Sequence, residues 1–143
     1  NCRFENCNFA VAKLTGTGLK DISFFGCKLV GIDFEPCSNF LFAVNFENCV
    51  LDYSSFFGKK MKKTRFIGCS LVEVDFATTD LSGAIFDKSN LSMAVFKQTN
   101  LESADFRAAE NFTLNPEENR MKKAKFSISG LAGLLGKYNL VIE

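Results

Sequence analysis

Residues 79–108 consist of six consecutive units of five residues: TDLSG, AIFDK, SNLSM, AVFKQ, TNLES and ADFRA. The middle residue of each unit is Leu or Phe, and the same interval extends in both directions through most of the chain. Helices repeat about every 3.6 residues and flat strands about every two, so neither produces a period of five. A short and strict period instead indicates a solenoid, in which each unit buries its apolar side only against neighbouring units.

The large residues at this interval form two stretches with one break between them. They are Phe4, Phe9, Leu14, Leu19, Phe24, Leu29 and Phe34, then Leu41, Phe46, Leu51, Phe56, Met61, Phe66, Leu71, Phe76, Leu81, Phe86, Leu91, Phe96, Leu101 and Phe106. Two residues before each of them lies a second, mostly small residue, and in extended backbone residues two apart face the same side. We therefore expect each unit to direct one large and one small side chain inward.

Grouping the units in fours sorts the large residues by type. The first column contains only Phe, the second is mostly Leu, the third is mostly Phe, and the fourth holds Leu19, Leu41, Met61, Leu81 and Leu101. A four-sided coil that stacks each type on itself explains this sorting, whereas a three-sided coil would mix the columns. At 4.7–4.9 Å per ladder step the rod should be about 25 Å long, with a filled interior too narrow for a ligand.

The units Thr79–Gly83, Ser89–Met93, Thr99–Ser103 and Ala104–Ala108 resemble the A-(D/N)-(L/F)-x-x signature of pentapeptide repeat proteins. The resemblance covers residues 2–126. It implies an all-β solenoid, a right-handed quadrilateral β-helix, with a short helical cap at the C-terminus. We expect the β-helix over residues 1–110, and the last repeat units, the capping helix and a tail over residues 111–143.

The break in the interval lies at Glu35–Phe40, where the spacing is seven instead of five. Because the column order continues after the break, the two extra residues should bulge from a corner. Pro36 suits such a turn, since it cannot donate to a ladder. With Leu41 in the inward position, Phe40 and Phe42 should point outward, and Asn39 should fill the small inward position.

The C-terminal segment changes pattern after Ala109. Leu114–Asn119 indicates a turn, and Ser127–Lys137 indicates a short amphipathic helix, with Ser129 as N-cap and Gly136 as C-cap. This segment should cover the open end of the rod, which otherwise exposes apolar core and strand edges. In the related proteins the same region also forms a two-fold dimer contact, which the resemblance assigns here to Leu131, Leu134, Leu135 and Tyr138. Capping alone and capping with dimerisation both remain open.

Five of the six cysteines occupy small inward positions, and Cys7, Cys27, Cys49 and Cys69 share one column. Buried thiols behave as small apolar groups, and a linear row does not converge on a metal ion. We therefore expect reduced cysteines, with disulfides or a metal site as the less favoured alternatives, and hence a cytoplasmic protein. Cys37 lies outside the row, and we expect it to be the exposed one.

Composition argues against catalysis. The chain has no His, its net charge is +1, and it carries no phosphate-binding, dinucleotide or zinc motif. We expect no enzyme activity, no catalytic residue, no cofactor and no metal, and no direct contact with nucleic acid or membrane. No signal peptide or long apolar run is visible, although Asn1 begins inside a repeat unit, so preceding coils remain an open question.

Lys59 occupies an inward position where small residues are expected. Its amine either reaches solvent through a local distortion or finds a hydrogen-bond partner such as Asn39 or Thr79. Around the break, aromatic and basic side chains gather in a pattern typical of a partner site; they are Phe40, Phe42, Phe57, Lys59, Lys60, Lys62 and Lys63. The alternative is that the bulge folds over the rings and the lysine stems cover the rest.

The sequence leaves three functions open. The first is a protein-interaction module with an unknown partner, and the second is a rigid structural spacer. The third is binding to DNA gyrase, because Arg120–Ser127 and the leucines that follow resemble the C-terminal end of the quinolone-resistance members of the family. Those relatives imitate DNA with negative charge, whereas residues 1–110 carry 12 Lys or Arg and 13 Asp or Glu. The long loops of many resistance proteins are also missing.

Overall fold

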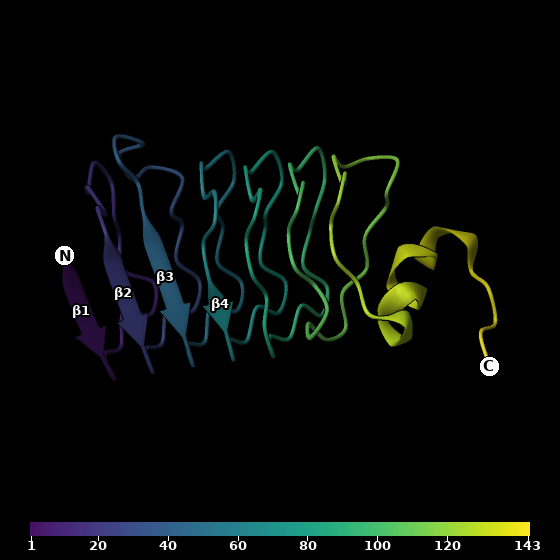
Figure 1. Cartoon of the computed structure of the whole chain (residues 1–143). Coiled ribbons are helices and arrows are strands. Elements are labelled where there is room, and N and C mark those ends of the chain that lie inside the picture. Colours follow the sequence, from purple (N-terminus) through teal and green to yellow (C-terminus); the bar gives the residue numbers. More distant parts are fainter.

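The computed structural model describes residues 1–143, which form a rod of stacked coils with the two termini at opposite ends (Figure 1). Regular elements are short because each coil turns a corner after a few residues. They are β1 (Cys2–Glu5), β2 (Ile22–Phe25), β3 (Val44–Glu47), β4 (Phe66–Ile67), η1 (Ile128–Leu134) and η2 (Gly136–Tyr138). Neither helix is long and apolar enough to cross a membrane.

The four strands form one parallel sheet in the order β1-β2-β3-β4 along one side of the rod, which we call face 1 (Figure 1). The register places Phe4 beside Phe24, Phe24 beside Phe46 and Phe46 beside Phe66. Single parallel bridges continue the stacking to the last coil, where Asp105 pairs with Lys125. The predicted column of phenylalanines is therefore confirmed.

Two stacks of Phe rings fill the interior. Rings of face 1 lie nearly parallel at centroid distances of 4.9 to 5.4 Å between successive coils. The second stack, from Phe34 to Phe96, meets the first edge to face; for example, Phe66 and Phe76 are 5.7 Å apart at 79°. Offset-stacked and edge-to-face pairs are the arrangements that ring quadrupoles favour, so the core is both apolar and geometrically ordered.

The break in the repeat differs from the prediction. Phe42 is buried at 8% exposure, whereas Leu41 is 64% exposed, so Phe42 and not Leu41 supplies the inward side chain. Cys37, expected to be exposed, is buried at 4% and takes the small position that we assigned to Asn39. The backbone explains the shift, since the Cys37 N–H donates to the Phe34 carbonyl as in a regular unit. The extra residues therefore follow Cys37, and the loop between β2 and β3 projects beyond the neighbouring coils (Figure 1).

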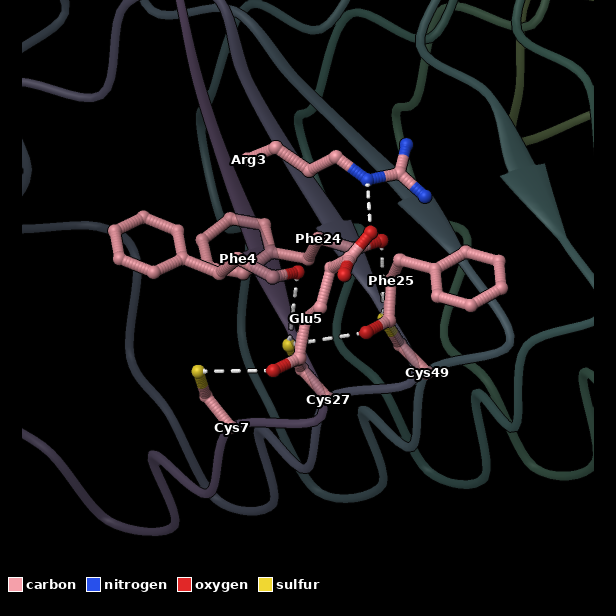
Figure 2. A network of polar contacts seen from close by, with 8 residues as sticks. All are labelled: Arg3, Phe4, Glu5, Cys7, Phe24, Phe25, Cys27 and Cys49. Atoms are coloured by element: carbon pink, nitrogen blue, oxygen red, sulfur yellow. Dashed lines mark hydrogen bonds and ion pairs between the residues drawn. The ribbon is translucent and has the colours of Figure 1, made fainter.

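The small inward positions also satisfy backbone carbonyls. Figure 2 shows Cys27 Sγ donating to the carbonyl of Phe4 and Cys49 Sγ to that of Phe24, each at 3.4 Å. Each of these bonds joins one coil to the coil before it. The hydroxyls of the later coils form equivalent bonds of 2.6 to 2.9 Å; they belong to Ser54, Thr79, Ser89 and Thr99. These small side chains therefore do more than fill space, because their polar groups donate hydrogen bonds to backbone carbonyls and so join successive coils.

The burial of these thiols predicts a graded chemical reactivity. Burial raises the pKa of Cys27 and of Cys37, and the pKa of Cys69 is raised by its hydrogen bond with Cys49 and by burial. Because the thiolate is the reactive form, these three should resist alkylation in the folded protein at mildly alkaline pH. Iodoacetamide labelling followed by peptide mass spectrometry should modify exposed Cys2 first, and Cys27, Cys37 and Cys69 only in denaturant. Rapid native labelling of Cys37 would contradict its placement in the core.

The C-terminal cap is helical, as predicted, but of a tighter type. It is a 3₁₀ helix that follows Ser127 rather than Ser129, and Gly136 begins η2 instead of ending the first helix. Two glycines within η1 disfavour a longer α-helix, and 3₁₀ helices are typically short. Gly133 is needed for close packing, because a Cβ there would lie 2.5 Å from the Phe112 carbonyl oxygen.

The cap is joined to the last coil through Phe112 and Leu114, which are both buried. The Phe112 ring packs 5.5 Å from that of Phe106 and 5.6 Å from that of Phe126. The Leu114 N–H donates to the Gly133 carbonyl at 2.8 Å. The predicted turn follows, where the Glu118 N–H donates to the Asn115 carbonyl, but Leu114 belongs to the core rather than to the turn.

Candidate interaction surface

The inserted loop exposes two large apolar side chains on the side of the rod that carries Leu19, Phe42, Met61, Leu81 and Leu101, which we call face 4. Phe40 is 66% exposed and Leu41 is 64% exposed. The Lys20 amine, from the coil before, lies 4.7 Å from the centroid of the Phe40 ring. The ring therefore projects to solvent with a cation against it, an arrangement that stabilises its orientation without covering it.

Lys59 holds this loop from inside the rod. Its Nζ donates to the Cys37 carbonyl at 2.5 Å and to Asn39 Oδ1 at 3.0 Å, and it lies 5.1 Å from the Phe42 ring centroid. The side chain is 1% exposed, so the alternative in which the amine reaches solvent is wrong and the partner Asn39 is confirmed. All three contacts belong to the loop, which makes Lys59 the residue that fixes its conformation.

The residues predicted from the sequence separate into two groups. Phe40, Phe57, Lys60, Lys62 and Lys63 are exposed. Phe42 and Lys59 are buried, so these two are not available to a partner and act on the surface only from beneath.

Leu41 is the exposed residue that the sequence pattern missed. The five-residue interval placed it in the core, and only its flanking aromatics hinted that the register was shifted. We refer to Lys20, Phe40, Leu41, Lys60, Lys62 and Lys63 as the loop surface. Phe57 lies on the adjoining side of the rod.

The capping end is the second apolar surface. Leu134 is half-buried and packs against the core, whereas Leu131, Leu135 and Tyr138 are exposed. Beyond them, the tail also exposes Leu140, Val141 and Ile142.

An ion pair links the capping end to the preceding turn. Lys137 Nζ lies 2.7 Å from Glu117 Oε1. This contact holds the pKa of Glu117 below its usual range and raises the pKa of Lys137. Both groups are therefore charged over the whole neutral pH range, and the pair positions η2 against the last coil.

Comparison with known families identifies the repeat. The family described as pentapeptide repeat region matches residues 1–76, and pentapeptide repeats (8 copies) match residues 60–98. Among curated proteins, none has a significantly similar sequence.

Solved structures share the architecture. Trypsin-treated QnrB1, a plasmid-mediated fluoroquinolone resistance protein, is 16% identical with a TM-score of 0.82, covering 99% of this chain and 68% of its own. HetL, involved in heterocyst differentiation regulation in the cyanobacterium Nostoc, is 20% identical with a TM-score of 0.54, covering 82% of this chain and 59% of its own. A protein from the thylakoid lumen of Arabidopsis thaliana is 24% identical with a TM-score of 0.50, covering 69% of this chain and 61% of its own.

At these identities the likeness concerns the fold alone, since one fold supports many functions. The stacked five-residue units and the family match over more than half of the sequence lead to one conclusion. The chain belongs to the pentapeptide repeat family and forms a right-handed quadrilateral β-helix.

Proposed function

We propose that this protein is a non-enzymatic interaction module that binds a protein partner through the loop surface. The observation that supports this most is the pair Phe40 and Leu41, each about two-thirds exposed although the rod has an ample core for apolar side chains. An apolar centre surrounded by cations is the composition of many partner sites, in which a few aromatic residues supply most of the binding energy. The loop is also held rigidly from beneath, which reduces the entropy lost on binding.

Partner capture tests this role. The purified rod, immobilised and exposed to lysate, should retain specific proteins that the double variant Phe40→Ser/Leu41→Ser loses. The matched control is Val11→Ser/Met93→Ser, because both residues are 75% exposed but lie elsewhere on the rod. Partners that bind the wild type and the loop variant equally would refute the role of the loop surface.

DNA gyrase is the second partner that we propose to test, because the C-terminal segment resembles that of gyrase-binding relatives. The solved structure of a fluoroquinolone resistance protein supports this only at the level of the fold. In a supercoiling assay with purified gyrase and a fluoroquinolone, protection by the wild-type rod but not by Phe40→Ser/Leu41→Ser is the expected result. Lack of protection at an excess of the rod would exclude gyrase as the partner, and the general interaction role would stand.

We also propose that the capping end pairs two copies of the chain. Leu131, Leu135 and Tyr138 form the exposed apolar surface for this contact, while Leu134 serves mainly the cap. Sedimentation velocity should give a dimer for the wild type and a monomer for Leu131→Ser/Tyr138→Ser. A wild-type monomer at high concentration contradicts the proposal. Because all six cysteines are free and four of them are buried, we place the protein in a reducing compartment such as the cytoplasm.

A further inference from the structure

The net charge of +1 conceals an uneven distribution around the rod. Six lysines point outward on face 4; they are Lys20, Lys60, Lys62, Lys63, Lys122 and Lys123. The two sides of the rod away from faces 1 and 4 carry more acids than cations. Their acids include Asp33, Glu35, Asp52, Glu73, Asp75 and Glu110, and their cations are Lys13, Lys28 and Lys97. Stacking produces this uneven distribution, because side chains at equivalent positions of successive coils lie on the same side of the rod.

Face 4 also carries three carboxylates, those of Asp21, Asp80 and Glu102. Asp80 Oδ1 accepts hydrogen bonds from the Ser82 N–H at 3.0 Å and from its hydroxyl at 2.8 Å. Glu102 pairs with Arg120. None of the six lysines forms an ion pair in the structure, whose four ion pairs all involve other cations. Together with Arg120, the six lysines outnumber the three carboxylates, so face 4 keeps an excess of positive charge.

The lysines form two clusters joined by a groove. Lys60 and Arg120 belong to one row of bridged residues, three coils apart, which corresponds to roughly 14 Å at 4.7–4.9 Å per step. Between them a shallow depression runs from Lys62 and Lys63 to Arg120. Small residues such as Ser82 and Gly83 line it, together with the carboxylates of Asp80 and Glu102. An extended segment of about five residues spans this distance.

We propose that face 4 binds an acidic, extended protein segment that lies along this groove, with an apolar side chain placed against Phe40 and Leu41. The inference rests on the proposed function and adds the chemistry of the partner and a second contact at Lys122 and Lys123. Carboxylates spaced along an extended chain match cations at both ends of the groove, whose charges act within the Debye length of about 10 Å at 0.1 M salt.

A nucleic acid fits this side less well. A polyanion wider than one strand would meet the acids of the adjoining side, Asp33 and Glu35 on the early coils and Asp75 further along. The exposed Leu41 also offers a nucleotide neither a stacking face nor a hydrogen bond.

Fluorescence anisotropy with a fluorescein-labelled oligoglutamate peptide ending in Phe tests the inference on the full chain. Lys62→Glu/Lys63→Glu and Lys122→Glu/Lys123→Glu should each weaken binding by about tenfold, and binding should weaken with added salt. The matched control, Lys88→Glu/Lys97→Glu, changes the charge equally on other sides and should weaken binding only slightly. All the lysines replaced in the test and control variants are exposed, and circular dichroism verifies that the variants fold.

Three results overturn the inference: no binding of the peptide, equal weakening by the control variant, or tighter binding of a labelled oligothymidylate at the same lysines. Its failure is distinguishable from that of the proposed function. If Phe40→Ser/Leu41→Ser loses the cellular partners but both lysine variants keep them, the proposal of an acidic segment is refuted and the interaction role stands. If the peptide binds at these lysines while the loop variant keeps every cellular partner, the basic groove stands and the role of the loop falls.

Discussion

Replacing Phe66 by Ala should lower the free energy of unfolding by about 3–5 kcal/mol, the largest effect we expect from any single core substitution. Phe66 is fully buried and its ring stacks between those of Phe46 at 5.4 Å and Phe86 at 5.2 Å. It also meets Phe56 and Phe76 edge to face. The substitution would leave a cavity that stiff neighbouring coils cannot close, since each coil contacts only the coils beside it.

Equilibrium urea unfolding followed by circular dichroism measures this effect. The matched control is Phe4→Ala, because Phe4 occupies the same column but is 36% exposed and stacks on one side only. We expect the control to lose much less stability. Equal losses at both positions would mean that the column does not act as a packed stack.

Replacing Lys59 by Ala should cost about 2–4 kcal/mol and release the inserted loop. The substitution removes a buried aliphatic stem and leaves the Cys37 carbonyl and the Asn39 amide oxygen without their donor. It also removes the cation from the Phe42 ring. Chymotrypsin should then cleave after Phe40 faster than in the wild type, because cleavage requires local opening of the loop.

The variant Lys59→Met distinguishes the contribution of the buried aliphatic stem from that of the charged ammonium group. It keeps most of the buried volume but not the ammonium group, so it should restore packing and still leave the loop loosened. Urea unfolding and the same proteolysis assay give both quantities. A methionine variant as stable and as resistant as the wild type would show that the ammonium contributes nothing, and that Lys59 does not position the loop surface.

The errors of sequence interpretation lie where the repeat is interrupted. Leu41 fits the interval and Phe42 does not, yet Phe42 is buried, because the extra residues enter after Cys37 rather than before it. A periodic pattern states how many residues are inserted but not where the backbone leaves the ladder. The partner of Lys59 was one of two named possibilities, and only the position of the Asn39 side chain decided between them.

The candidate surfaces were likewise predicted only in part. The exposure of Phe57 follows from its position next to the inward Phe56, whereas Phe40 is exposed because it lies in the inserted loop, between Asn39 and Leu41, which are also exposed. The charge polarity does not follow from the net charge, since it appears only when the outward positions of successive coils are superimposed. The packing of the cap onto the last coil depends on the close approach of Gly133 to Phe112, a contact between separate segments that no local pattern specifies.

The amino-acid sequence by itself determined the four-sided coil and the identity of the columns, because the order of its large residues stacks one type on itself only when four units make a coil. The tertiary structure decided which residue enters the core at the break, how the buried amine of Lys59 is satisfied and which side of the rod is basic. These features depend on contacts between coils about twenty residues apart, where packing and hydrogen bonding select among conformations that the local sequence permits equally.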